Sequence, residues 1–504
     1  MFYPSIVENL ARNAAKSPDK LCLADEKKAL TYKEVWDAVC GLAMHLDSMG
    51  VRREQCVIVE CNQSVDYMIC EFAIQLLKAI FVPLEKNAAD QRIIEIATET
   101  EAVLHIANRP LPIDASLSIP HIDISTVCDF ALGQERDGVY YGSIDDLEVV
   151  DFPKSDDVAE ILFSTGTTGK SKGIVLTHGN DVALAENVCY GVKMKPDNVE
   201  MIPMPTSHSH GLRRTYGNIA NGSSVVYVDN VMLLKKVFAM MDQYGVTSMD
   251  LSPSILGIIF KLSKDRLGDY ADTMDYIQLG SAPLSEEDKT HLSRILPKTR
   301  LYNFYGSTEA GCSCLMDFNE AQKPKGCIGK PATNAEFIVV DENRQPIQSS
   351  PDNLGFLASR GSINMKEYFK APELTREAMP EGDYIYTKDL GYIDEDGYVY
   401  MLGRKDDVIN FGGVKISPEE IESMVIKSDK IKDCACVPMD DPITGQAPKL
   451  FIVLADGVEY DAKEFSTFLA GALDANKQPK VVEVIDEIPR TFNGKIKRNE
   501  LIGK

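Results

Sequence analysis

The most informative part of the sequence is the stretch Ile161-Leu-Phe-Ser-Thr-Gly-Thr-Thr-Gly-Lys-Ser-Lys-Gly-Ile-Val-Leu176. Two apolar runs flank a segment made only of Ser, Thr, Gly and Lys. Glycines bring backbone N–H groups close to an anion, while hydroxyl and ammonium groups add donors and charge. We predict a loop that holds nucleotide phosphates between two strands, with a flexible solvated loop as the alternative. The candidate phosphate-binding residues are Ser164, Thr165, Gly166, Thr167, Thr168, Gly169, Lys170 and Lys172.

A Walker A loop differs from this segment in two ways. Its GxxxxGK[ST] pattern begins with glycine, whereas Ser164 stands at that position here. A Walker loop also opens a helix directly, whereas Gly-Ile-Val-Leu-Thr at 173–177 is typical of a second strand. A P-loop NTPase is therefore disfavoured.

The composition limits the classes of partner. The 504 residues include 53 Lys+Arg and 76 Asp+Glu, which gives a net charge of −23. At ~150 residues per domain the length predicts roughly three domain-sized units. The acidic excess argues against nucleic acid or an anionic membrane as the main partner, although a few local cations can still bind a small anion.

Targeting and metal signals are few. The first 20 residues have no basic region followed by an apolar core, so we expect no signal peptide. The apolar stretch 69–84 is interrupted by Glu71 and Lys78, and it predicts a buried helix feeding a strand. Twelve cysteines without a CxxC pair and seven histidines without HExxH predict neither disulfides nor zinc. We therefore expect reduced core thiols in a cytoplasmic protein.

Short apolar runs rich in β-branched residues alternate with helical patterns along most of the chain, which predicts an α/β fold. We expect a large N-terminal domain of α/β layers over 1–404, with a small β-rich subdomain starting near Asn334. A small, mobile α+β domain is expected over 405–504, after the charged GRKDD turn. The expected strands include 56–60, 225–228, 276–280, 337–340 and 399–402, and the expected helices include 32–49 and 90–100.

Four further motifs follow the phosphate loop. They are QLGSAPL at 278–284, YNFYGSTE at 302–309, YIYTKDLG at 384–391 with Gly403-Arg404, and PRTFNGKIKR at 489–498. With the loop, they resemble in composition and order the AMP-forming adenylating enzymes. That family comprises acyl- and aryl-CoA synthetases, stand-alone adenylation domains and luciferases. The resemblance covers essentially the whole chain.

The resemblance implies a nucleotide site. The small residues of QLGSAPL form a turn that lets a flat ring approach the backbone. A tight strand-to-helix loop without a ligand would have the same composition. The family places adenine between this turn and an aromatic residue, and it assigns the Mg²⁺ carboxylate to Glu309, beside Thr308. The implied adenine residues are Gly280, Ser281, Ala282, Pro283, Asn303, Tyr305 and Gly306.

The resemblance also assigns residues to the sugar and to domain movement. Asp389 and Arg404 are expected at the ribose hydroxyls, with a surface ion pair as the alternative. Lys388 departs from the family, in which glycine usually precedes this aspartate. The expected hinge is Asp406, and Gly413 and Lys415 are expected near the active site in the thioester-forming state, with Asn410 where some relatives have lysine. Lys495 resembles the lysine that bridges the carboxylate and the α-phosphate.

The acid pocket is expected around residues 204–214, MPTSHSHGLRR. His208 matches a histidine that commonly orients the carboxylate in relatives, although a histidine packed against a strand end is the alternative. Amino acids are disfavoured because this segment lacks the aspartate that would hold an ammonium group. The HxHGL run is similar to malonyl-CoA synthetases, but the arginine they carry on a later helix is replaced. We hypothesise that Arg213 or Arg214 shortens the pocket or pairs with a second polar group; the alternative is surface arginines.

The predicted function is an AMP-forming carboxylic acid–CoA ligase that uses ATP, Mg²⁺ and coenzyme A. The alternative is a stand-alone adenylation enzyme that loads the phosphopantetheine of an acyl carrier protein. A nucleotide-sensing or scaffold protein is disfavoured because Lys495, Glu309, Asp389 and Arg404 are all present. A small-molecule acid is expected as substrate, with no nucleic-acid partner and no integral membrane segment.

Overall fold

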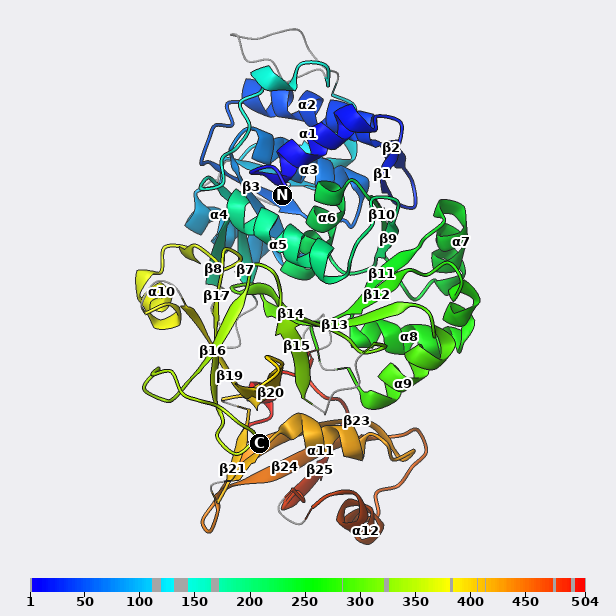
Figure 1. The fold of residues 1–504 in the computed structure, drawn as a ribbon, viewed down its shortest axis with the longest axis vertical. Coiled ribbons are helices and arrows are strands. Elements are labelled where there is room, and N and C mark those ends of the chain that lie inside the picture. Colours follow the sequence, from blue (N-terminus) through cyan, green and yellow to red (C-terminus); the bar gives the residue numbers. More distant parts are fainter. Residues whose placement is uncertain are drawn as a thin grey trace.

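Figure 1 shows the computed structural model of the chain, with the C-terminal unit at one end and the N-terminal helices at the other. The structure describes residues 2–110, 119–130, 144–164, 172–282, 284–320, 326–380, 384–405, 407–412, 414–474, 477–490 and 495–503, and of Ser164 and Lys415 the backbone only. Three sheets organise these residues, two in the N-terminal part and one in the C-terminal unit.

The first sheet forms a 13-stranded path. Its centre, from β13 to β1, is parallel, whereas neighbouring strands from β16 to β13 pair antiparallel. The strands β16, β17, β19 and β20 follow Asn334 and form the β-rich part that the sequence predicts. In spatial order the strands are β16 (Glu336–Val340), β17 (Gly355–Arg360), β19 (Tyr384–Ile393), β20 (Val399–Arg404), β15 (Cys327–Pro331), β14 (Gly311–Asp317), β13 (Arg300–Ser307), β12 (Tyr276–Leu279), β11 (Ser248–Leu251), β9 (Val199–Ile202), β10 (Ser224–Tyr227), β1 (Leu21–Ala24) and β2 (Ala29–Thr31).

The second sheet has seven strands, and three of its inner strands, β3, β4 and β5, are buried along their whole length and are mostly apolar, as in CVIVE at β3. Such runs fit a sheet that is covered on both faces. In order the strands are β18 (Glu367–Tyr368), β8 (Lys172–Thr177), β7 (Val158–Ser164), β4 (Ile80–Leu84), β3 (Cys56–Glu60), β5 (Leu104–Ala107) and β6 (His121–Asp123).

Helices pack between and around the two sheets (Figure 1). The largest core joins helix and strand residues of both sheets around the fully buried Trp36. Local sequence sets the helix ends: Thr31 and Glu34 form a capping box that starts α2. The helices are α1 (Ile6–Lys16), α2 (Tyr32–Ser48), α3 (Val65–Leu76), α4 (Asp90–Thr100), α5 (His178–Gly191), α6 (Ser209–Asn221), α7 (Leu234–Tyr244), α8 (Pro253–Ser263), α9 (Glu286–Ile295) and α10 (Pro372–Ala378).

The C-terminal unit has its own sheet and its own cores. In one core, α11 and α12 pack on one face of the sheet. Each helix buries the apolar residues that recur with the helical period of 3.6 residues. The elements are β21 (Ile409–Phe411), β22 (Val414–Ile416), α11 (Pro418–Val425), β23 (Ile431–Asp441), β24 (Gly445–Leu454), α12 (Ala462–Ala472) and β25 (Val481–Val484).

The α/β fold class is confirmed, and the five predicted strands and two predicted helices are present with shifts of a residue or two at their ends. The stretch 69–84 ends α3, a buried helix, and continues into β4. All twelve cysteines are free. Within the described ranges, every helix is too short or too polar to cross a bilayer. The domain boundary at 404/405 and the mobility of the C-terminal unit stay predictions.

Candidate active site

The predicted phosphate loop joins two antiparallel strands. β7 and β8 pair up to Ser164 opposite Lys172, so a strand and not a helix follows the loop, as the sequence predicts. The predicted site residues that lie outside the described residues are Thr165, Gly166, Thr167, Thr168, Gly169, Lys170, Pro283, Asp406 and Gly413.

Thr308 and Glu309 lie in the tight turn between β13 and β14, next to this hairpin. Strand β18, which pairs with β8, places the Tyr368 hydroxyl 2.9 Å from Glu309 Oε1. Lys172 Nζ lies 5.5 Å from the centroid of the Tyr368 ring. One buried tyrosine thus connects the base of the phosphate loop to the carboxylate expected at the metal.

Arg213 braces the same turn from helix α6. Its two terminal nitrogens donate hydrogen bonds of 2.8 Å to the carbonyl oxygens of Ser307 and Thr308. Its side chain is buried, and burial lowers the pKa of the guanidinium while Glu160 and Asp181 oppose that shift. The fork geometry of arginine fixes the two carbonyls in one orientation.

Arg214 forms hydrogen bonds with other buried side chains. Its guanidinium is 1 % exposed and donates to Glu200 Oε1 and to Gln278 Oε1, the latter at 2.9 Å. Both arginines are therefore core residues, and the surface alternative is wrong. The structure gives both of them protein partners, so the hypothesis that one of them meets the acid has no support in these contacts.

Two of the expected nucleotide residues, Arg404 and Tyr305, contact Asp389, which pairs with Arg404 across β19 and β20. Arg404 Nε donates to Asp389 Oδ1 at 3.2 Å, and the Tyr305 hydroxyl donates to Asp389 Oδ2. Burial raises the pKa of Asp389, while Arg404 and Tyr305 oppose the shift. Lys388 instead pairs with Glu377 at 2.9 Å.

One buried acceptor in this region lacks a partner. Asn303 Oδ1 is shielded from solvent and accepts no hydrogen bond from the described residues. An unsatisfied buried acceptor is costly, and an exocyclic amine would satisfy it. This atom therefore fits the adenine contact that the resemblance implies.

Two glycines allow close approaches that a side chain would block. A Cβ at Gly280 would lie 1.8 Å from the Phe304 ring, and one at Gly306 would lie 1.9 Å from the carbonyl oxygen of Gly311. Gly280 thus makes room for Phe304, and Ser281 and Ala282 follow in the turn. Gly306 marks the bulge that turns β13 toward Thr308.

The C-terminal lysine reaches this site. Lys495 lies close enough to Asp389 and Arg404 for their charges to act on its ammonium. Surrounding protein atoms and Arg404 lower the pKa of Lys495, and Asp389 and Asp407 oppose the shift, although part of the residue stays exposed. The C-terminal unit therefore presents this cation to the expected ribose and phosphate region.

Arg498, three residues further on, anchors the segment that carries Lys495. It donates to Glu422 Oε1 at 2.7 Å and to Glu419 Oε1 at 2.9 Å, and its Nε lies 3.8 Å from Asp407. The two glutamates lie on α11, and Asp407 follows the predicted hinge. The arginine is 7 % exposed, whereas its acidic partners are partly exposed, so the network lies at the edge of the protein interior with its cation buried.

Helix α6 brings two histidines to the opposite side of the site. His208 immediately precedes the helix, and burial lowers its pKa, which favours the neutral ring. Ser209 Oγ lies 3.1 Å from Thr308 Oγ1. His210 contacts Ser281 on one side of its ring and Asp250 on the other.

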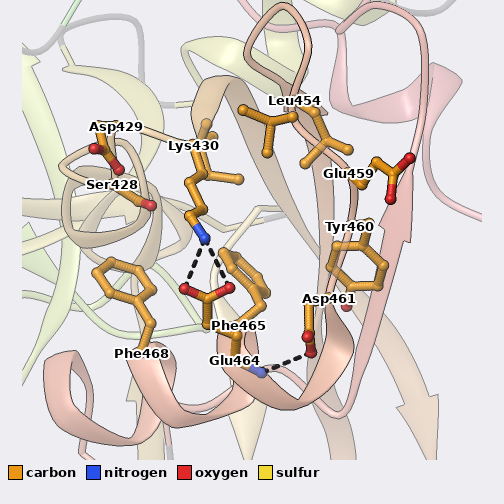
Figure 2. A pocket seen from close by; sticks show the side chains of 12 residues that line it. Ser428, Asp429, Lys430, Leu454, Glu459, Tyr460, Asp461, Glu464, Phe465 and Phe468 are labelled. Carbon is orange, nitrogen blue, oxygen red and sulfur yellow. Dashed lines mark hydrogen bonds and ion pairs between the residues drawn. The ribbon is translucent and has the colours of Figure 1, made fainter.

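A pocket in the C-terminal unit lies elsewhere. Figure 2 shows Lys430 paired with Glu464 beside Phe465 and Phe468. Its volume is about 200 Å³, below the roughly 300 Å³ of typical small-molecule sites, and its lining contains no predicted site residue. This pocket is therefore not the nucleotide site.

Sequence reasoning assigned no role to four residues near the site, namely Tyr368, Arg498, His210 and Asp250. Tyr368 contacts Glu309 and His210 contacts Ser281, whereas Asp250 contacts His210 and Arg498 anchors the segment that carries Lys495. Two signals were available. Asp250 places a charge in the short buried strand SMDL, and His210 completes the HxH pair that begins at His208. Arg498 ends the PRTFNGKIKR motif, but the motif does not identify its partners on α11, and Tyr368 carries no local signal.

Comparisons with known proteins agree with this geometry. A family model described as AMP-binding enzyme matches residues 10–369, and one described as AMP-binding enzyme C-terminal domain matches 420–495. Similar curated proteins include 4-coumarate-CoA ligase 1 of Narcissus pseudonarcissus, 25% identical over 97% of this chain and 92% of that protein. Another is 2-succinylbenzoate–CoA ligase of Bacillus cereus, 26% identical over 98% and 97%.

Solved structures share the fold over the full length. ATP-bound MatB from Rhodopseudomonas palustris has a TM-score of 0.85 at 22% identity and covers 98% of both chains. The o-succinylbenzoate CoA synthetase MenE from Bacillus subtilis, in complex with its acyl-adenylate intermediate, has a TM-score of 0.84 at 22% identity. That match covers 99% of this chain and 98% of that one.

Proposed function

The chain belongs to the AMP-binding enzyme family, and from this premise we propose how its residues act as an AMP-forming acid–CoA ligase. The enzyme is an ATP-dependent ligase. An oxygen of the acid carboxylate attacks the α-phosphorus of ATP, and the bond to pyrophosphate breaks to give an acyl-adenylate. The thiol sulfur of CoA then attacks the acyl carbonyl, and AMP leaves as the thioester forms.

In the first step, repulsion between two anions is the main obstacle. Lys495 acts as the cation between carboxylate and α-phosphate, and His208 orients the carboxylate. The phosphate loop, 164–172, binds the β- and γ-phosphates. Preorganised charges of this kind are worth on the order of 10²–10³ in rate each.

In this proposal, several side chains bind the nucleotide and its metal ion. Asn303 Oδ1 accepts from the adenine amine, Tyr305 stacks on the ring, and Asp389 and Arg404 bind the ribose hydroxyls. Glu309 and Thr308 offer hard oxygen ligands for Mg²⁺, and the Tyr368 hydrogen bond orients the carboxylate for that role. When bound, the metal would neutralise phosphate charge.

The second step requires the lysine to leave. A rotation at Asp406 would withdraw Lys495 and bring Gly413 and Lys415 toward the acyl-adenylate. Coenzyme A is the acceptor; the phosphopantetheine thiol of a carrier protein is the second candidate, because it is the same chemical group. The free cysteines support a cytoplasmic setting.

The observation that carries the proposal is that Lys495 lies near enough to Asp389 and Arg404, on the other side of the predicted hinge, for their charges to act on its ammonium group. The test is acid-dependent ATP–pyrophosphate exchange across a panel of carboxylic acids, followed by comparison of CoA with a carrier protein. We expect exchange with at least one acid and thioester formation with CoA. Absence of exchange with every acid would contradict an adenylating enzyme.

A further inference from the structure

Three polar side chains form a hydrogen-bonded row on the acid side of the site. His210 Nδ1 lies 2.6 Å from Ser281 Oγ, and His210 Nε2 lies 3.0 Å from Asp250 Oδ1. Asp250 is fully buried and His210 is 9 % exposed, whereas Ser281 is exposed. The row thus runs from the protein interior to an accessible hydroxyl group.

The row lies at the carboxyl ends of the parallel strands. Asp250 is on β11, Ser281 follows β12, and His210 is in the first turn of α6. The residue before it, Ser209, contacts Thr308, in the turn that carries Glu309. In open α/β sheets this edge is where ligands bind.

The backbone at Ser281 is strained. Its φ of 70° lies in the left-handed region, which is unfavourable for a residue with a side chain. Such strain is characteristic of functional sites, where the surrounding structure enforces it. Phe304 contributes to this enforcement, because its ring packs on Gly280 and meets the His210 ring edge-on at 4.7 Å.

The protonation pattern of the row follows from Asp250. We assign the ring hydrogen to His210 Nε2, which then donates a hydrogen bond to the carboxylate oxygen of Asp250. In this tautomer Nδ1 is an acceptor and receives a hydrogen bond from the Ser281 hydroxyl. The lone pairs of Ser281 Oγ stay available to accept a hydrogen bond. The hydrogen bonds to His210 and Asp250 polarise the hydroxyl group and make its oxygen a stronger acceptor. The exposed end therefore accepts a hydrogen bond from a ligand.

We propose that Ser281 recognises a hydroxyl group on the acid substrate, so that the enzyme activates hydroxy acids in preference to their deoxy analogues. The inference rests on the proposed acid–CoA ligase function and names its substrate class. A second carboxylate would be repelled by the electron-rich Ser281 oxygen and by Asp250 behind it. Ser281 is the specificity-determining residue, and His210 and Asp250 are positioning residues.

The test compares matched pairs of acids that differ by one hydroxyl group, such as 3-hydroxybutanoate with butanoate and 4-hydroxybenzoate with benzoate. The readout is kcat/KM for the acid in pyrophosphate exchange. We expect the hydroxy member of at least one pair to be preferred on the order of 10- to 100-fold. Equal rates in every pair would overturn the inference while leaving the ligase function intact.

Three variants test whether Ser281 and Asp250 cause the preference for the hydroxy acid. Ser281→Ala should lose the hydroxy acid's advantage. The readout is the ratio of kcat/KM for the two acids of a pair, because Ser281 also belongs to the turn expected at adenine and its loss can change both rates. Ser281→Gly, which relieves the left-handed strain, should fold at least as well and lose the same advantage. Asp250→Asn should also reduce the preference, because an amide N–H at His210 Nε2 would move the ring proton to Nδ1.

Ser285→Ala, at the start of α9 outside the site, is the matched control and should keep the preference. A preference that survives both Ser281 variants would contradict the proposal. Absence of exchange with every acid would instead remove the ligase function, and the inference with it.

Discussion

The Tyr368 hydroxyl donates a 2.9 Å hydrogen bond to Glu309, and this contact joins the strand beside the phosphate loop to the carboxylate expected at the metal. Metal-binding carboxylates are commonly oriented by such partners, and removal of the partner costs about 10–100-fold in metal affinity. The site therefore depends on a tyrosine that lies outside every motif identified in the sequence.

Tyr368→Phe should raise the Mg²⁺ concentration for half-maximal pyrophosphate exchange by about tenfold. The phenyl ring keeps its place over Lys172 and only the hydrogen bond is lost. Tyr270→Phe, which removes a hydroxyl contact with Asp242 on the surface, is the control. An unchanged Mg²⁺ dependence in Tyr368→Phe would show that the hydroxyl does not orient Glu309.

Lys495→Ala should abolish acyl-adenylate formation and spare thioester formation from a supplied acyl-adenylate. The reason is that, in the proposed mechanism, the lysine lies near Asp389 and Arg404 during the first step and is withdrawn before the second. Each half-reaction is measured separately, by pyrophosphate exchange and by thioester yield. Lys497→Ala, two residues away and paired with Glu500, should be nearly neutral. An equal loss of rate in both half-reactions would contradict a role of Lys495 in the first step alone.

Arg498→Met should lower kcat for adenylation and leave the KM for ATP unchanged. The variant removes the cation that Glu419 and Glu422 share, which should lower the free energy of unfolding, and it releases the segment that carries Lys495. Thermal unfolding and exchange kinetics measure the two effects. Arg490→Met, which breaks an exposed ion pair with Asp433, is the control. Equal changes of kcat and Tm in the two variants would contradict the role of Arg498 as the anchor of the Lys495 segment.

Arg213→Lys should reduce kcat by about 10- to 100-fold and leave the ratio of rates among different acids unchanged. A lysine keeps the charge but cannot donate to the Ser307 and Thr308 carbonyls at once. The acid panel measures both quantities. A changed acid preference would restore the hypothesis that Arg213 meets the substrate.

Three buried carboxylates should make the protein less stable as pH rises. Burial raises the pKa of Glu160 from 4.5 to about 7, and it also raises the pKa of Glu71 and Asp181. Between pH 4.5 and about 7, folded Glu160 retains a proton that the unfolded chain releases, so stability falls through this window.

Glu160→Gln removes this ionisation and keeps an acceptor for Tyr216, whose hydroxyl donates at 2.6 Å. The decrease in Tm from about pH 5 to about pH 8 should therefore be smaller in the variant than in the natural protein. Glu287→Gln, on the exposed face of α9, should show the natural decrease. The same decrease in both variants would exclude Glu160 as its source.

The sequence by itself determined the fold class, the strands on both sides of the phosphate loop and the motifs that hold Thr308, Glu309, Asp389 and Arg404. These features are local, because short apolar runs specify strands and small or polar residues specify the turns that follow them. Even the pairing of Asp389 with Arg404 needs only one hairpin.

Only the tertiary structure decided which side chains support these motifs. Tyr368 and Glu309 are 59 residues apart, Arg213 and Thr308 are 95 apart, and His210 is 71 from Ser281 and 40 from Asp250. Such contacts depend on strand order, register and helix rotation, which the packing of the whole core sets. A local pattern of residues carries no information about a partner that another sheet or helix supplies.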